Sequence, residues 1–359
     1  MPTNRPGSSR SPAAGRRPGK APASHGTAVW STPEWQAEAL SWLDQRLATA
    51  GIARRGDVEQ PHLRPWATVL RVPTTAGVVW MKAAAPGTAF EAGLYELLAS
   101  AAPDRVLTPI ATDAARGWIL LPDGGPPLGE RLTGADLVEP LVAALVDYGR
   151  MQLDLAPHVD RLLSLGVADM RPPVMAERFD QALAATRADL DGRAADRSIH
   201  RQVAAMGETV TSWCERLATS SVPPSLDHND LHPWNILGDG GGDGVRFYDW
   251  GDSVVAHPFA AMLVPLGFVQ RLLGVGLDDP RFADARDAYL DVFRPVAPGE
   301  DLVATLELAC CVAKIARVLT WDRAVRAARD EGQEVEESWR SAPMETLASL
   351  LDDSYLGGA

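Results

Sequence analysis

From residue 226 to residue 237 the chain reads Leu-Asp-His-Asn-Asp-Leu-His-Pro-Trp-Asn-Ile-Leu, and from 245 to 252 it reads Val-Arg-Phe-Tyr-Asp-Trp-Gly-Asp. Asp230 and Asn235 are five positions apart, a spacing at which one loop can carry both polar side chains. The glycine-rich run 238–244 between the two segments predicts a hairpin turn, and Asp249 ends a short apolar strand after it. We therefore expect three oxygen-bearing side chains in one place.

These residue types favour one kind of chemistry. Hard cations such as magnesium bind carboxylate and amide oxygens, and phosphoryl transfer uses such cations to neutralise charge on nucleotide phosphates. Asn235 and Asp249 are the candidate metal ligands. Asp230 is the candidate catalytic residue, with its carboxylate directed at a substrate hydroxyl.

The same residues carry a family resemblance. The segment 228–235, His-Asn-Asp-Leu-His-Pro-Trp-Asn, resembles the His-Gly-Asp-Leu-His-Pro-x-Asn motif of the aminoglycoside phosphotransferase and choline kinase family, the small-molecule branch of the protein-kinase-like superfamily. Asp249-Trp250-Gly251 is similar to the metal-binding Asp-Phe-Gly of that superfamily. Asn229 and Trp234 depart from the usual glycines.

The resemblance implies an α+β, bilobal protein-kinase-like fold. Its small N-lobe would combine a β-sheet with a helix, and its larger C-lobe would be mostly α-helical. We place a disordered basic tail at 1–28, the N-lobe with a leading helix at 29–122, and the C-lobe with the catalytic loop, metal site and acceptor site at 123–359. The tail has five basic residues and no acidic ones, together with many Pro, Gly, Ser and Ala residues.

Lys82 stands out because only three of the 34 basic residues are lysines. A compact ammonium suits a phosphate contact. Segments 66–72 and 77–83 predict a β-hairpin with Lys82 on its second strand, and the run before Lys82 resembles the third-strand lysine segment of kinase-like small lobes.

The resemblance further implies a glutamate partner for this lysine on the helix predicted at 88–100. This helix carries Glu91 and Glu96. We choose Glu91, because the following leucines place an apolar face against the sheet while Glu91 can turn inward. Glu96 falls among residues that we expect outside.

The nucleotide site has two further features. No Gly-x-Gly-x-x-Gly loop precedes the hairpin, and 60–65 occupies its place, as is common in small-molecule members of the superfamily. The strand predicted at 117–122 resembles the inter-lobe hinge, which places the adenine near Leu121 and Asp123 through backbone groups.

Several helices are predicted outside these motifs. Residues 32–50 form an amphipathic helix that begins with a Ser-Thr-Pro-Glu signal and packs on the small lobe. Further helices are expected at 135–156, 172–190, 197–219, 259–275, 280–294, 300–328 and 332–352. Asp279 is expected to cap the helix that follows it. The acidic run 330–337 could receive a polyamine, although a solvated helix face is the commoner meaning of such a run.

Composition bounds the remaining expectations. A chain of 359 residues, 46% of them hydrophobic, can bury a sizeable core, and its net charge of -13 argues against nucleic-acid binding while permitting a cationic substrate. Three cysteines and no signal-peptide pattern favour reduced thiols in the cytoplasm, without a membrane partner. We expect a monomer or homodimer.

We predict an ATP- and Mg2+-dependent phosphotransferase that acts on a small-molecule hydroxyl, plausibly that of an aminoglycoside or another hydroxylated amine, with GTP as the alternative donor. Two other classes remain open. A metal-dependent hydrolase could use the cluster of His228, Asp230 and His232. A nucleotide-binding pseudokinase could keep the fold as a scaffold, a reading favoured by Asn229 and the missing glycine loop.

Overall fold

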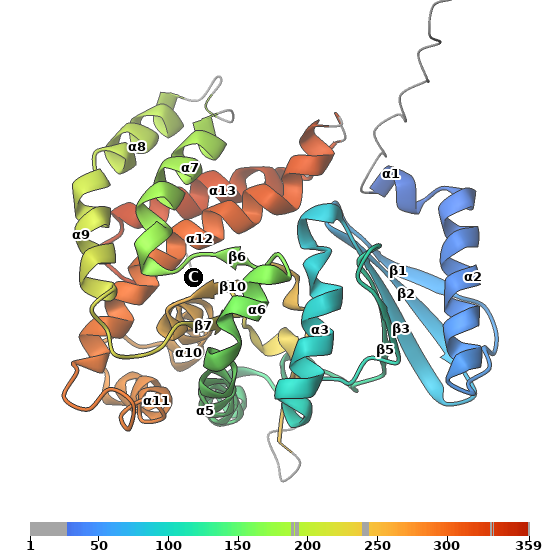
Figure 1. Ribbon diagram of the computed structural model, residues 1–359. Helices are drawn as coiled ribbons and strands as arrows, with labels where there is room; N and C mark the ends of the chain where they lie inside the picture. Colours follow the sequence, from blue (N-terminus) through green and yellow to red (C-terminus); the bar gives the residue numbers. More distant parts are fainter. Residues whose placement is uncertain are drawn as a thin grey trace, which may run out of the picture.

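The computed structural model describes residues 27–187, 190, 194–238, 244–330, 332 and 334–357. A five-stranded sheet and its helices form one lobe, and a larger group of helices forms the other (Figure 1). The basic tail predicted at 1–28 lies outside the described residues except for its last two, which begin the short helix α1 (Thr27–Trp30).

The N-lobe sheet is antiparallel throughout, with strand order β1-β2-β3-β5-β4. Its strands are β1 (Glu59–Leu63), β2 (Ala67–Thr74), β3 (Gly77–Ala84), β4 (Ala111–Asp113) and β5 (Trp118–Pro122). The predicted hairpin is present as β2 and β3, with Lys82 on β3 between Val69 and Ile119. Strand β1 was not predicted, because its sequence Glu-Gln-Pro-His-Leu contains a proline and does not alternate apolar and polar residues.

Helices cover the two faces of this sheet, α2 (Pro33–Thr49) on one side and α3 (Phe90–Ala101) on the other (Figure 1). Met81 of β3 belongs to the apolar cluster under α2. Because neighbouring side chains on a strand point to opposite faces, Lys82 faces the α3 side. The sheet thus directs this lysine toward the other lobe.

The prediction that 32–50 forms a helix packed on the small lobe is confirmed. Thr32 caps α2 by accepting a hydrogen bond from the Trp35 amide at 3.2 Å. Trp35 and Trp42 meet Trp118 of β5 edge to face, with ring centroids 6.2 and 5.5 Å apart. Each such pair contributes about 0.5–1.5 kcal/mol of stability beyond that from the apolar area it buries. This helix is therefore an integral part of the N-lobe core.

The C-lobe is mostly helical, as predicted. Its helices are α4 (Leu128–Arg131), α5 (Val138–Leu155), α6 (Val159–Ser164), α7 (Met175–Arg187), α8 (Ala194–Ala204), α9 (Gly207–Leu217), α10 (Leu263–Leu273), α11 (Pro280–Leu290), α12 (Leu302–Asp330) and α13 (Glu337–Ala348). The predicted cap is present, since Asp279 accepts a hydrogen bond from the Arg281 amide at 2.9 Å.

Five helix predictions need correction. Those expected at 172–190 and 280–294 are shorter, since α7 follows a 3-10 turn over Pro172–Val174 and α11 ends at Leu290. The helix expected at 197–219 is divided into α8 and α9, with Gly207 at the start of α9, consistent with the low helix propensity of glycine. The helix expected at 259–275 begins with a 3-10 turn over Pro258–Met262, so α10 starts only at Leu263. The helix expected at 332–352 spans only Glu337–Ala348.

A second, smaller sheet lies inside the C-lobe, with strand order β6-β10-β7. It consists of β6 (Ala168–Asp169), β7 (Ser225–Asp227) and β10 (Val254–Ala256), and a two-stranded ribbon, β8 (Ile236–Leu237) with β9 (Arg246–Phe247), lies between β7 and β10 in the sequence. Strands of two or three residues are too short to produce a periodic pattern, which explains why β6, β7 and β10 were missed.

Two compositional expectations can be compared with the structure. All three cysteines are free, with Cys214 and Cys310 buried and Cys311 half-buried. Within the described part of the chain, none of the helices is both long and apolar enough to cross a membrane.

Candidate active site

The loop from His228 to Asn235 connects β7 to β8 and closes on itself. The Asn235 side-chain amide donates a hydrogen bond to the backbone carbonyl of Asp230 at 2.9 Å, and the Asn235 backbone N–H donates to the His232 carbonyl at 2.8 Å. The five-residue spacing therefore holds Asn235 in one orientation. Since the Asn235 side-chain nitrogen is bonded to the Asp230 carbonyl, the side-chain oxygen of Asn235 points away from that carbonyl.

The β8–β9 pairing brings the second segment beside this loop, as the glycine-rich turn predicted. Ile236 pairs with Phe247, and the Tyr248 amide donates to the Asn235 carbonyl at 3.2 Å. His228 adds a further link, because its Nε2 lies 3.0 Å from the Tyr248 carbonyl oxygen. Asp249 follows directly, next to the loop that carries Asp230 and Asn235.

Asp249 adopts a left-handed backbone conformation with φ 64°, which is uncommon for a residue other than glycine. Two contacts with the N-lobe accompany it. Its Oδ1 lies 2.5 Å from Lys82 Nζ, and the next amide, that of Trp250, donates to Glu91 Oε1 at 3.0 Å. Strained conformations of this kind cost about 1–3 kcal/mol and cluster at functional sites.

Lys82 also contacts Glu91, with Nζ 2.9 Å from Oε1 and 2.7 Å from Oε2. Glu91 is fully buried on α3, as expected for the glutamate that turns inward. Glu96 is exposed and accepts a hydrogen bond from Thr112 on β4. The structure thus places the residue that we chose, and not Glu96, beside the lysine.

The surroundings favour the charged forms of Lys82 and Asp249, whereas burial raises the pKa of Glu91. Burial lowers the pKa of Lys82, but the carboxylates of Asp249 and Glu91 raise it further, so it stays above its ordinary value. Partial loss of hydration raises the pKa of Asp249, whereas its contact with Lys82 lowers this pKa more, so that it lies below the usual range. Lys82 and Asp249 are therefore both ionised at neutral pH.

Asp230 lies close to two basic side chains. Its Oδ2 is 3.4 Å from His232 Nε2, and its Oδ1 is 3.5 Å from Arg317 Nη1. Burial raises the pKa of Asp230, but the hydrogen bond with His232 and the charge of Arg317 lower it to about 2. Asp230 therefore carries a negative charge across the physiological range.

The predicted hinge residues lie at the end of β5. Leu121 is buried and pairs with Trp80 of β3. The Asp123 carboxylate accepts hydrogen bonds from the Gly125 amide and the Trp80 indole, both at 3.3 Å. The Asp123 side chain therefore stabilises the turn after β5, and any contact with a base here would fall to backbone groups.

The candidate metal ligands form an Asn–Asp pair. Their amide and carboxylate oxygens suit magnesium, and the left-handed turn at Asp249 presents a carboxylate that is half exposed, with a side-chain exposure of 51%. In the described residues no group of three or more His, Cys, Asp or Glu side chains could hold a metal ion. His228 is fully buried and bonded to the Tyr248 carbonyl. This arrangement does not favour the hydrolase alternative.

Two residues near the site were not predicted. Arg317 of α12 reaches Asp230, but its position in a mostly apolar helix gives no sequence signal for this contact. His62 of β1 lies in the electrostatic field of the site, since burial, Arg64 and Lys82 lower its pKa while Asp249 raises it. This segment occupies the position of the missing glycine loop.

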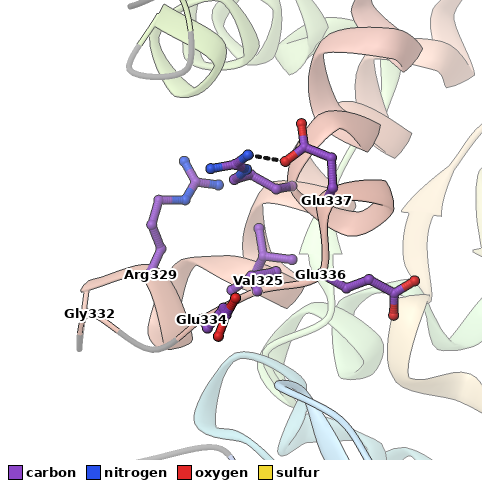
Figure 2. Close-up of a pocket in the computed structure, with 8 residues that line it drawn as sticks. Val325, Arg329, Gly332, Glu334, Glu336 and Glu337 are labelled. Atoms are coloured by element: carbon purple, nitrogen blue, oxygen red, sulfur yellow. Dashed lines mark hydrogen bonds and ion pairs between the residues drawn. The ribbon is translucent and has the colours of Figure 1, made fainter.

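A separate pocket opens between the end of α12 and the start of α13 (Figure 2). Part of the acidic run lines it, but Glu337 forms an ion pair with Arg340, drawn as the dashed line in Figure 2, and Glu336 accepts a hydrogen bond from Ser338 at 2.9 Å. Glu331 lies outside the described residues. None of the predicted site residues lines this pocket.

The fold and the site together define a phosphotransferase of the kinase-like type. Residues 54–298 match the model of the family described as "Phosphotransferase enzyme family". The chain belongs to this family. The resemblance to aminoglycoside phosphotransferases and choline kinases is thereby confirmed. No curated protein sequence matches the chain.

Solved structures confirm the predicted α+β, kinase-like fold. Ethanolamine kinase from Plasmodium vivax matches with a TM-score of 0.61 and 12% identity over 92% of this chain and 91% of its own. Choline kinase LicA from Streptococcus pneumoniae matches with a TM-score of 0.56 and 12% identity, covering 87% and 99%. Macrolide 2'-phosphotransferase MphH from Brachybacterium faecium matches with a TM-score of 0.52 and 18% identity, covering 86% and 98%.

Proposed function

We propose that this protein transfers the γ-phosphate of ATP to a hydroxyl group of a small hydroxylated amine. One observation carries the proposal. Lys82, with its partners Glu91 and Asp249, adjoins the loop on which Asp230 and Asn235 are held, so the groups proposed to bind the phosphates and the hydroxyl lie in one site. Family membership supports the general class of reaction.

The donor side of the site would hold a magnesium nucleotide. The oxygens of Asn235 and Asp249 would hold the cation, which supplies positive charge that neutralises the nucleotide phosphates when it is bound. Lys82 would contact the phosphates as a point charge. A related amicoumacin kinase, 12% identical with a TM-score of 0.50, has been solved with AMP-PNP, which supports ATP over GTP as the first donor to test.

Asp230 would meet the acceptor. Its carboxylate can accept a hydrogen bond from the acceptor hydroxyl, which aligns the oxygen for attack on phosphorus, and it takes the hydroxyl proton as the new O–P bond forms and ADP leaves. Because the pKa of Asp230 is held at about 2, it is a weak base. We therefore assign it mainly an orienting role, with proton transfer late in the reaction.

The acceptor side contains an exposed aromatic ring. Trp234, one residue before Asn235, keeps 44% of its surface exposed and packs near Phe268, with ring centroids 6.1 Å apart. Asp252 is a further carboxylate nearby, since its backbone carbonyl accepts a hydrogen bond from Asn229, the residue before Asp230, at 3.3 Å. Loss of hydration and repulsion by Asp230 raise the pKa of Asp252 to about 7, although Arg323 acts in the opposite direction. An aromatic face and carboxylates suit a hydroxylated amine, and the net charge of -13 agrees with a cationic acceptor.

A transfer screen tests this proposal. Labelled ATP and GTP would be offered with Mg2+ to a panel of aminoglycosides, choline, ethanolamine and macrolides, the last three taken from the names of related structures. We expect transfer to at least one hydroxylated amine and none without metal. Binding of nucleotide without transfer to any of these compounds would instead favour the pseudokinase scaffold.

The variant Asp230→Asn tests the catalytic assignment. The variant removes the group that orients the acceptor hydroxyl, so single-turnover transfer should fall by about 10²-fold or more. Nucleotide affinity should change far less, because Asp230 faces the acceptor. If transfer survives within a few-fold, Asp230 does not have this role.

A further inference from the structure

The long helix α12 presents three polar side chains to the active-site loops. Arg317, Thr320 and Arg323 are three residues apart and therefore share one face of the helix. Thr320 Oγ1 accepts a hydrogen bond from Asn229 Nδ2 at 2.8 Å, and Arg323 Nη2 donates to the Gly251 carbonyl at 3.1 Å. One helix face thus contacts both segments of the site.

Asn229 immediately precedes Asp230 and adopts a left-handed conformation with φ 61°. Asparagine tolerates this conformation better than most residues, and here its buried side chain is also bonded. In addition to the Thr320 contact, Nδ2 donates to the Asp252 carbonyl at 3.3 Å, and the backbone N–H donates to Asp227 Oδ1 at 2.6 Å. The loop conformation is therefore held by an asparagine side chain at a position where the family motif often has glycine.

Arg317 contacts the same point of the loop. Its Nη1 donates a hydrogen bond to the Asn229 carbonyl and lies 3.5 Å from Asp230 Oδ1. The Arg317 side chain is only 13% exposed, so solvent screens this charge weakly. With His232 facing Oδ2, the Asp230 carboxylate has a basic neighbour at each oxygen.

We propose that Arg317, Thr320 and Asn229 form a positioning latch, by which α12 orients Asp230 toward the acceptor hydroxyl. The inference rests on the proposed function, because it assumes that Asp230 meets the acceptor. The three are positioning residues, since each acts through the loop and not on the substrate. A helix that only supports the fold would instead affect stability and leave the geometry of the loop unchanged.

The chain offers a matched control on the same helix. Arg326 forms an ion pair with Asp322, and its side chain is 59% exposed. Arg326→Met removes an arginine from α12 without touching the loop. Arg317→Met is the corresponding change in the latch, Arg317→Lys restores the charge, and Thr320→Val removes only the hydroxyl.

Two measurements test the latch. Hydrogen exchange of residues 227–236 in the protein alone should accelerate in Arg317→Met and Thr320→Val but not in Arg326→Met. With Mg-ATP and the panel member that the wild type phosphorylates fastest, Arg317→Met should lower kcat by about 10²-fold, the effect of a misplacement near 1 Å. KM for ATP should stay within roughly twofold, and Arg317→Lys should recover part of kcat, because it keeps the charge beside Asp230.

A double-variant cycle provides the third readout. Asn229→Gly permits the left-handed backbone but removes the side-chain bonds, so Asn229→Gly combined with Thr320→Val should reduce kcat less than the product of the two single effects. The latch would be overturned if the two single effects on kcat multiply in the double variant, or if hydrogen exchange of residues 227–236 is unchanged in the latch variants. A loss of kcat that only matches the loss of folded protein would also overturn it. If the wild type transfers phosphate to no panel member, the proposed function fails, and the exchange measurement still decides whether the latch exists.

Discussion

The ammonium nitrogen of Lys82 lies 2.5 Å from a carboxylate oxygen of Asp249, although the two residues are 167 positions apart in the chain. The contact joins β3 of the N-lobe to the loop after β9. Glu91, the other partner of Lys82, is fully buried, whereas the Asp249 side chain is 51% exposed. Asp249 is therefore the partner that a cation in solution can reach.

The first prediction concerns the geometry of the cationic group at position 82. Lys82→Arg keeps the positive charge, so the variant should fold, but a forked guanidinium cannot replace a compact ammonium between Glu91 and Asp249. We expect kcat/KM for phosphate transfer to fall roughly 10–100-fold, as for a misplaced substrate-positioning group. Steady-state kinetics and circular dichroism would measure the two properties.

The reverse exchange at Arg294, Arg294→Lys, provides the control, because this exposed arginine pairs with Asp291 on the surface of the C-lobe. It should leave transfer unchanged. Full activity of Lys82→Arg would contradict the role assigned to this lysine.

The second prediction concerns the metal at Asp249. A nucleotide present at 100 times its dissociation constant should stabilise the wild type by about 2.7 kcal/mol. We expect this stabilisation to require Mg2+, and Asp249→Ala to lose it, because the variant lacks one of the two proposed metal ligands. Thermal-shift assays with ATP, in the presence and absence of Mg2+, would measure this stabilisation. Each protein would be compared with its own ligand-free state.

Asp291→Ala is the control, since this carboxylate is 61% exposed and pairs with the nearby Arg294. It should keep the full response. Equal stabilisation of the wild type with and without Mg2+ would count against the metal site.

Local sequence patterns predicted the N-lobe part of the site. The hairpin 66–83 placed Lys82 on a strand, and the alternation of side chains then directed it away from the core under α2. The leucines of α3 fixed which glutamate turns inward. These predictions succeeded because each rests on a periodicity that spans several residues.

Other features of the site depend on tertiary contacts. Arg317 meets Asp230 across 87 positions, and no local pattern encodes that approach. The left-handed conformation of Asn229 depends on bonds to Thr320 and Asp252, which lie in other segments. The strands β7 and β10 were missed because each has only three residues and their pairing joins segments far apart in the chain.

The third prediction concerns acid stability. His257 is buried, its Nδ1 accepts a hydrogen bond from the Phe259 amide, and its Nε2 lies 3.0 Å from Ser220 Oγ. Burial lowers the pKa of His257 to about 4 from 6.5. The folded state therefore binds a proton less readily than the unfolded state, so this group destabilises the protein as the pH falls from about 6.5 to 4. The full effect is about 3 kcal/mol.

His257→Asn keeps an acceptor for the Phe259 amide but does not titrate in this range. We expect the variant to be less stable than the wild type at pH 7 and the difference to shrink toward pH 4.5. Urea unfolding at both pH values would measure it. A difference that stays constant with pH would show that His257 is not the titrating group.

The fourth prediction concerns the proposed acceptor side, where Trp234 is an exposed aromatic residue of the loop 228–235. Its indole lies over Gly129 of α4 so closely that a Cβ on Gly129 would come within 2.6 Å of the ring. If Trp234 contacts the acceptor, Trp234→Gly should raise KM for the acceptor about tenfold or more, in the range of a lost cation–π contact of about 2 kcal/mol. KM for ATP should change little.

Gly129→Ala supplies an independent route to the same result. This glycine has no left-handed φ, so alanine fits its backbone, and the added methyl group should displace the rigid indole without removing it. We expect Gly129→Ala to raise KM for the acceptor in the same direction as Trp234→Gly, and the double variant to be no worse than Trp234→Gly alone, because the methyl group then has no ring to displace. Trp234→Phe should keep most of the affinity. If both single variants leave KM for the acceptor unchanged, the exposed ring does not contact the acceptor, and recognition must come from the carboxylates of the site.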